Sequence, residues 1–199
     1  LVLTTQELAK MIKEAGIDFA NLPDTEPDDP FAEYTGAGVI FGVTGGVTEA
    51  VIRHVLGTVT TEQIASVAEC GVRGLEGIKA FEVKAGDLTL KIAVASGLGN
   101  ADKLIKRIQS GEVSYDFVEV MACRRGCIMG GGQPVGAGPR TRKARAKGLY
   151  DTDVNMQIKK SNENPMVLAL YEGLLKGKTH QLLHLSLIHI SEPTRRRGI

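Results

Sequence analysis

The chain has 199 residues, of which 43% are hydrophobic and 5% aromatic, and its formal net charge is +1. This near-neutral balance gives no electrostatic reason to expect a nucleic-acid partner, and no apolar run is as long as a membrane helix requires. Three cysteines, an odd number, do not fit a secreted disulfide framework. We therefore expect a cytoplasmic α/β protein with reduced cysteines that binds neither nucleic acid nor membrane.

The N-terminal part predicts two helices separated by a loop. Residues 4–16 predict the first helix, because Thr4 can cap it together with Glu7, three residues later. A polar, proline-containing stretch follows and predicts the loop. The glycine-rich string GVIFGVTGG then leads into a second helix that ends at Gly57.

The middle of the chain predicts strands around a further helix. Residues 78–97 alternate around a Gly-Asp turn, which indicates a hairpin whose second strand is buried at Ile92 to Ala95. A helix capped by Asn100 or Asp102 follows, and the string YDFVEVMA predicts the next strand. This order favours a βαβ unit with parallel pairing. The expected fold is therefore α/β, an incomplete βαβ-type lobe with a helical C-terminal segment.

The composition changes after Pro134. A Gly/Pro-rich stretch gives way to a basic run, and an amphipathic helix is expected to start near Pro165. The run either docks an acidic partner or forms one solvated helix face. Its members are Arg140, Arg142, Lys143, Arg145 and Lys147.

The two ends of the chain do not look natural. The chain does not begin with Met, and residues 185–195 read LSLIHISEPTR, which is similar to the conceptual translation of a transposon-based sequencing adapter. The alternative is an apolar C-terminal strand followed by a basic tail. We expect residues 185–199 to be a non-native tail and the rest to be part of a longer protein.

The string EVMACRRGCIMGGGQP, residues 119–134, carries the strongest chemical signal. Cys123 and Cys127 can place two thiolates around one metal centre, but two thiolates alone cannot hold a cubane cluster, which takes four cysteines. Gly130, Gly131 and Gly132 remove bulk where a cofactor would need close backbone approach and N–H donors. From these residues alone, a structural cysteine pair and a metal site with further ligands elsewhere both remain open.

This string closely resembles the third signature of the iron-only ([FeFe]) hydrogenases, with every fixed position present. The strings GAGVIFGVTGGVTEA, VRGLEGIK, VASGLGNA and ENPMVLALYEGLL resemble further segments of the same catalytic domain, in the same order. The resemblance covers residues 1–184. It implies a division into residues 1–138, the C-terminal lobe of the large-subunit catalytic domain, and residues 139–184, a helical segment like the small subunit.

The resemblance also implies roles for individual residues. Cys123 and Cys127 would ligate a [4Fe-4S] cluster, and the Cys127 sulfur would bridge to a two-iron subcluster with CO, CN⁻ and a dithiolate bridge. Met121 would pack beside the two-iron half, and Phe41 would line its pocket. Gly130 to Gly132 would leave room for this hydrogen-activating cluster, the H-cluster.

The implied activity is the reversible reduction of two protons to H₂. Ferredoxin or an NAD(P)-linked diaphorase subunit would exchange the electrons, and hydrogenase maturation proteins would be further partners. The first two signatures, which supply the remaining cluster cysteines, are missing from the sequence, so residues 1–199 alone are expected to be inactive. The alternatives are a hydrogenase-like iron–sulfur assembly protein without H₂ activity and a hydrogen-sensing relative.

The other candidate residues have simpler interpretations. Cys70 has no ligand partner at useful spacing and is expected to be a free core thiol. His54 is expected at or near the surface of a helix. His180 and His184 are four residues apart and could bind a metal on one helix face, or form a solvated pair.

Overall fold

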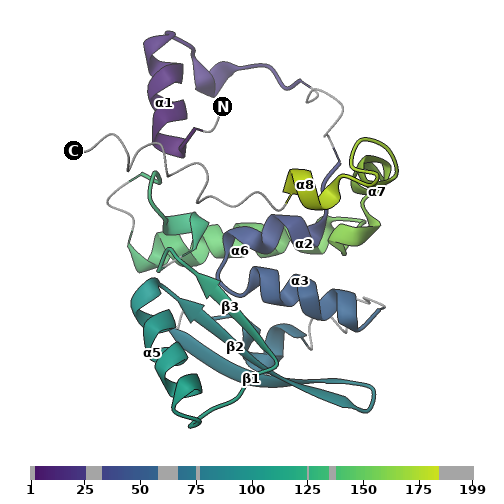
Figure 1. Cartoon of the computed structure of the whole chain (residues 1–199). Helices are drawn as coiled ribbons and strands as arrows, with labels where there is room; N and C mark the ends of the chain where they lie inside the picture. Colours follow the sequence, from purple (N-terminus) through teal and green to yellow (C-terminus); the bar gives the residue numbers. More distant parts are fainter. Residues whose placement is uncertain are drawn as a thin grey trace, which may run out of the picture.

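The computed structural model describes residues 3–25, 33–57, 67–74, 77–124, 126–134 and 138–183. The expected α/β class is confirmed, because a small mixed sheet is combined with helices on its two faces and along one end (Figure 1). His184 and the expected non-native tail lie outside the described residues. In the described part of the chain, no helix has the length and apolar character needed to cross a membrane.

Three strands form the sheet: β1 (Ile78–Ala85), β2 (Leu88–Ser96) and β3 (Phe117–Met121). β1 and β2 pair as an antiparallel hairpin, and β2 pairs with β3 in parallel, in the order β1-β2-β3. Helix α5 (Leu98–Gln109) makes the connection between the parallel strands. The predicted hairpin and the predicted βαβ unit are therefore both present.

The two faces of the sheet bury different residues. Ile92 packs with Ile52 of helix α3 (Gly46–Val55) on one face, while Ala93 packs with Leu104 of α5 on the other. This alternation follows from the two-residue period of a strand. Burying a large aliphatic side chain stabilises the fold by about 1.5–3 kcal/mol, so these contacts hold β2, the strand that pairs with β3.

The predicted cap of α5 is wrong. The helix begins at Leu98, and its N-cap is Gly97, which has a φ of 89° and no side chain to cap with. Asn100 lies inside the first turn instead, and its Nδ2 donates a hydrogen bond of 2.6 Å to the carbonyl of Ser96. The tight Gly97 turn starts the helix earlier than the polar residues indicate.

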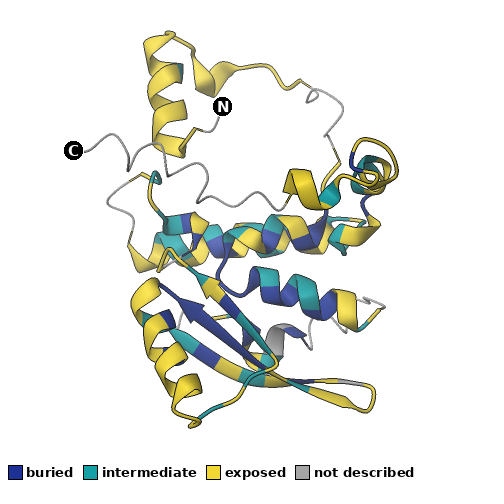
Figure 2. Ribbon diagram, in the orientation of Figure 1, coloured by how far each residue is buried: buried dark blue, intermediate teal, exposed yellow. Residues whose placement is uncertain are grey.

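Helix α1 (Thr5–Glu14) has the predicted capping box. Thr4 Oγ1 accepts a hydrogen bond from the Glu7 amide at 3.2 Å, and the Thr4 amide donates to Glu7 Oε2 at 2.7 Å. These hydrogen bonds lower the pKa of the Glu7 carboxyl. No residue of α1 is buried, and the helix stands apart from the sheet (Figure 2).

The C-terminal part is helical, as predicted, but its last helix is divided in two. Gly173 and Gly177, the latter with a φ of 68°, interrupt the expected single helix. A long helix, α6, lies along the short helix α2 (Figure 1). The bounds are Gly36–Val39 for α2, Pro139–Asn155 for α6, Pro165–Glu172 for α7 and Thr179–Leu183 for α8.

Candidate metal centre

The loop after β3 carries both candidate cysteine ligands. Cys123 and Cys127 are exposed free thiols, and a 3₁₀ turn, η4 (Cys127–Met129), follows the first loop residues. The Gly126 amide donates to the Cys123 carbonyl at 3.0 Å, and the Met129 amide donates to the Gly126 carbonyl at 3.2 Å. These two turns hold the backbone that links the thiols and leave both sulfur atoms open to solvent.

Two glycines allow this loop to fold tightly. Gly126 has a φ of 70°, and a Cβ there would lie 2.8 Å from the carbonyl oxygen of Gly42. A Cβ on Gly130 would lie 3.3 Å from Cys123 Sγ. A side chain at Gly126 would therefore push the loop off the preceding segment, and one at Gly130 would crowd the Cys123 thiol.

The other two glycines of the triplet have different surroundings. A Cβ on Gly132 would lie 2.5 Å from Thr4 Cβ, whereas nothing lies within 4 Å of one on Gly131. The Gly132 carbonyl also accepts a hydrogen bond of 3.0 Å from the Gln6 amide. Gly132 thus provides the close contact between the cysteine loop and the start of α1.

Glu119 joins the strand that precedes the cysteines to helix α3. Its carboxylate is buried and accepts hydrogen bonds from the amides of Gly45 and Thr48, both at 2.8 Å, and from Thr48 Oγ1 at 2.6 Å. Gly45 is the N-cap of α3 and offers no side-chain acceptor, so Glu119 satisfies the free amides at this positive helix end.

The sequence alone assigns no role to Glu119. The available signal was a single acidic residue within the otherwise apolar strand FVEVM. A buried carboxylate is expected to have hydrogen-bond partners, but those partners lie more than 70 residues earlier in the chain.

The structure brings the glycine-rich segment GVIFGVTGG against the cysteine loop. Val43 packs with Ile128, the residue after Cys127, in one apolar cluster. Phe41 lies in the preceding turn, η2 (Ile40–Gly42), with 42% of its surface exposed. Met121 is half-buried at the end of β3. These two predicted pocket residues therefore lie on the two segments that flank the loop.

The remaining candidate ligands lie elsewhere. Cys70 is half-buried, its Sγ donates to the Val67 carbonyl at 2.9 Å, and burial raises the pKa of its thiol. His54 is exposed on α3, and His180 is exposed on α8. Across the described ranges, no three His, Cys, Asp or Glu residues are close enough together to hold a metal ion.

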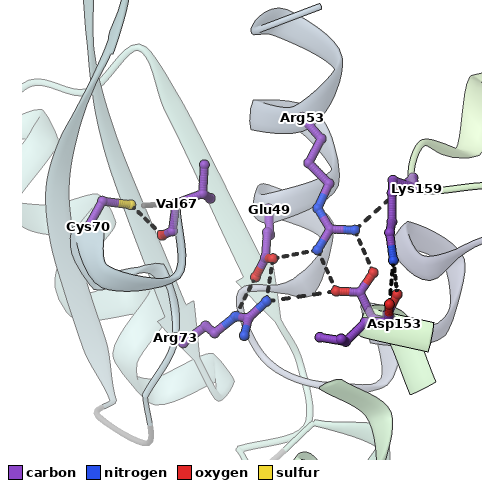
Figure 3. Close-up of polar contacts among 8 residues, drawn as sticks. Glu49, Arg53, Val67, Cys70, Arg73, Asp153 and Lys159 are labelled. Atoms are coloured by element: carbon purple, nitrogen blue, oxygen red, sulfur yellow. Dashed lines mark hydrogen bonds and ion pairs between the residues drawn. The ribbon is translucent and has the colours of Figure 1, made fainter. Parts of the chain in front are cut away.

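A buried network of four charged side chains joins α3, the segment that carries Arg73, and α6 (Figure 3). The Arg53 guanidinium contacts both oxygens of Asp153, at 2.8 and 2.6 Å, and Glu49 Oε1 at 2.6 Å. Arg73 contacts Glu49 at 2.7 and 2.9 Å, and its guanidinium lies 4.0 Å from the centre of the Tyr150 ring.

The network pairs two cations with two carboxylates, and three of its four side chains are closed to solvent. The side chains of Glu49 and Asp153 are 0% exposed, and that of Arg53 is 1% exposed. Burial opposes the charge on Arg53, but its hydrogen bonds to the Asp153 carboxylate and the negative charges of Glu49 and Asp153 raise its pKa overall. Because Asp153 belongs to α6, the network anchors the C-terminal helical segment to α3.

The donor chemistry of the loop fits one side of an iron–sulfur cluster. Thiolates are the ligands that hold such clusters, and the loop carries two exposed cysteines. Gly130, which has no side chain, lies next to the sulfur atom of Cys123. A cubane normally takes four cysteines. The loop can therefore provide two ligands, and the other two must come from another part of the protein.

Comparison with protein-family models divides the chain into two parts. Residues 1–131 match the model described as "Iron only hydrogenase large subunit, C-terminal domain". Residues 139–186 match "Iron hydrogenase small subunit". Cys123, Cys127 and Glu119 fall within the first match, and Asp153 falls within the second.

Similar proteins include two hydrogenases. The NADP-reducing hydrogenase subunit HndD of Solidesulfovibrio fructosivorans is 47% identical over 92% of this chain and 32% of its own length. Iron hydrogenase 1 of Clostridium pasteurianum is 41% identical over 92% of this chain and 33% of its own length. Protein NAR1 of Arabidopsis thaliana is 29% identical over 88% of this chain and 38% of its own length.

A solved structure of the [FeFe]-hydrogenase HydA(deltaEFG) has the same fold. It superposes with a TM-score of 0.61 and 35% sequence identity, over 88% of this chain and 53% of that chain. The present chain thus spans about a third of the length of the curated relatives that it matches.

Proposed function

The chain belongs to the iron-only hydrogenase family, and on this premise we propose that it forms the C-terminal, cluster-binding part of an [FeFe]-hydrogenase. The proposed reaction is the reversible reduction of two protons to H₂. The observation that carries the proposal is the pair of exposed thiols of Cys123 and Cys127 on one loop. The GVIFGVTGG segment contacts this loop through the packing of Val43 on Ile128, and it contacts the preceding strand through the hydrogen bond from Gly45 to Glu119.

The proposal assigns a role to each residue of the loop and of the segments beside it. Cys123 and Cys127 would hold the [4Fe-4S] half of the H-cluster, and Cys127 would also help to hold the two-iron half, whose further ligands are CO, CN⁻ and a dithiolate. Met121 and Phe41 exclude water from the pocket around it. Gly130 keeps side-chain atoms away from the Cys123 sulfur. When bound, the cluster would pass on electrons from the redox partner and supply the iron site for the reduction of two protons to H₂.

The two family matches, residues 1–131 and 139–186, support a division of the chain into two parts. We assign residues 1–138 to the large-subunit lobe and residues 139–184 to the small-subunit-like segment. The buried pairing of Asp153 with Arg53 supports a fixed arrangement of the two parts. The proposed electron partner is an NAD(P)-linked diaphorase subunit or ferredoxin, and HndD, described as NADP-reducing, favours the former. An NADP-linked partner also favours a cytoplasmic location.

The sequence similarity to Protein NAR1, together with a cytosolic Fe-S cluster assembly factor of Xenopus tropicalis at 28% identity, supports a second candidate. In that case the same thiols would hold an iron–sulfur cluster in an assembly protein that makes no H₂. HndD and iron hydrogenase 1 are 47% and 41% identical to this chain, so the hydrogenase proposal has the better support.

Infrared spectroscopy of the complete, matured subunit tests the proposal. We expect CO and CN⁻ stretching bands together with H₂ evolution, and we expect a Cys127→Ser variant to lose both. The matched control is Cys70→Ser, which changes a thiol outside the loop and should retain both. A [4Fe-4S] signal without CO and CN⁻ bands in the wild-type protein would support the assembly protein instead.

A further inference from the structure

Arg145 of α6 reaches across to the turn that carries Cys127. Its Nη1 donates a hydrogen bond of 2.7 Å to the carbonyl oxygen of Ile128 and lies 3.5 Å from Met129 Sδ. The side chain is half-buried. Although the basic run was expected to form a solvated face or a docking site, this member of it contacts the residue next to a candidate cluster ligand.

The hydrogen bond from Arg145 differs from the others that hold the loop. The carbonyls of Cys123, Gly126 and Cys127 accept hydrogen bonds from amides within the loop, at 3.0, 3.2 and 3.5 Å. The Ile128 carbonyl receives a charged donor from α6 instead. A hydrogen bond from a charged donor is about twice as strong as one between neutral groups, so the guanidinium holds the turn more firmly than a neutral donor would.

Side-chain packing adds to this hold. Ile128 is 8% exposed and forms an apolar cluster with Val43 and Ala146, the residue after Arg145. Two consecutive residues of α6 therefore contact the turn: Arg145 through a hydrogen bond and Ala146 through side-chain packing. The Cys127 backbone takes its position from this contact because it begins the same 3₁₀ turn.

The Arg145 guanidinium brings a positive charge to the Cys127 turn. No Asp or Glu in the part of the chain that the structure describes forms an ion pair with this guanidinium. Its positive charge is therefore not cancelled locally, and partial burial reduces screening by water. Net charge and hydrogen bonding around a cluster set its reduction potential.

We propose that Arg145 is a positioning residue that fixes the Cys127 turn and raises the reduction potential of the [4Fe-4S] cluster held there. The proposal rests on the proposed function, because it requires a cluster on Cys123 and Cys127. Reduction adds one electron to the cluster, and a nearby cation stabilises the more negative product. A segment that matches the small-subunit model thus tunes a cluster bound by the large-subunit part.

The test is an EPR-monitored redox titration of the complete subunit loaded with the [4Fe-4S] cluster alone, without the two-iron half. We expect Arg145→Gln to shift the midpoint potential to more negative values, and Arg145→Lys to keep it near the wild-type value. The matched control is Lys143→Gln, which removes an exposed charge from the same helix and should leave the potential unchanged.

Each outcome decides the proposal. An Arg145→Gln protein that binds the cluster with the wild-type potential overturns it. If that variant binds no cluster, recovery of the cluster in Arg145→Lys supports the role of the cation, and loss in both variants overturns it. Wild-type protein that binds no [4Fe-4S] cluster refutes the proposed function itself, which separates that failure from a failure of the inference alone.

Discussion

Substitution of Asp153 by Asn tests whether the buried charge network anchors the C-terminal helices. The change keeps the side-chain size but removes the negative charge that faces both donor nitrogens of Arg53. One carboxylate, Glu49, is then left against two guanidinium groups. The new amide also places N–H groups against the N–H donors of Arg53.

The expected cost is large because the site is closed to water. Removing one partner of a buried ion pair costs about 3–5 kcal/mol, and both Asp153 and Arg53 are at most 1% exposed. For a domain of this size about 1 kcal/mol corresponds to about 2–4 °C in melting temperature. We therefore expect Asp153→Asn to melt about 6–20 °C below the wild type.

Urea unfolding and thermal melting of the apo-protein measure this effect. Asp151→Asn is the matched control, because Asp151 lies on the same helix and pairs with Lys147 where both side chains are exposed. We expect this control to lose no more than about 0.5 kcal/mol. A loss below about 1 kcal/mol in Asp153→Asn, or one equal to that of the control, would refute the structural argument.

Two further predictions concern Glu119 and Tyr150. Glu119→Gln should lower the free energy of unfolding in urea by about 1–3 kcal/mol, because one backbone amide at the start of α3 loses its acceptor. Glu82→Gln is the control because Glu82 is exposed. Equal losses in the two variants would contradict the role of Glu119 as an acceptor for these amides. Burial and the Glu49 carboxylate raise the pKa of Tyr150 to about 12. Its stabilising contribution should therefore be complete below pH 10 and decline towards pH 12, and a Tyr150→Phe protein with the same pH dependence would disprove this.

Local patterns in the chain were sufficient to predict most of the secondary structure. The capping box of α1 and the β1–β2 hairpin depend on residues within a few positions of one another, and such signals are readable from a sequence. The predicted helix bounds are wrong where a glycine with positive φ sets the helix end instead of a polar residue. Gly97 starts α5 earlier than predicted, and Gly177 separates α8 from α7.

The sequence also sufficed to single out the cysteine loop as the candidate metal centre. Cysteine spacing and consecutive glycines are local properties, and the family matches agree with the resemblance that they carry. The assignment of Met121 and Phe41 to the pocket stays a prediction, although both lie on segments that flank the loop.

Only the tertiary structure decided what holds that loop in place. Glu119 accepts hydrogen bonds from Gly45 at a separation of 74 residues, and Arg53 binds Asp153 across 100 residues. Arg145 meets the Ile128 carbonyl only because α6 packs against the turn. Charged residues of these types also occur on solvated surfaces, so their partners depend on how distant segments pack, which periodicity and spacing do not encode.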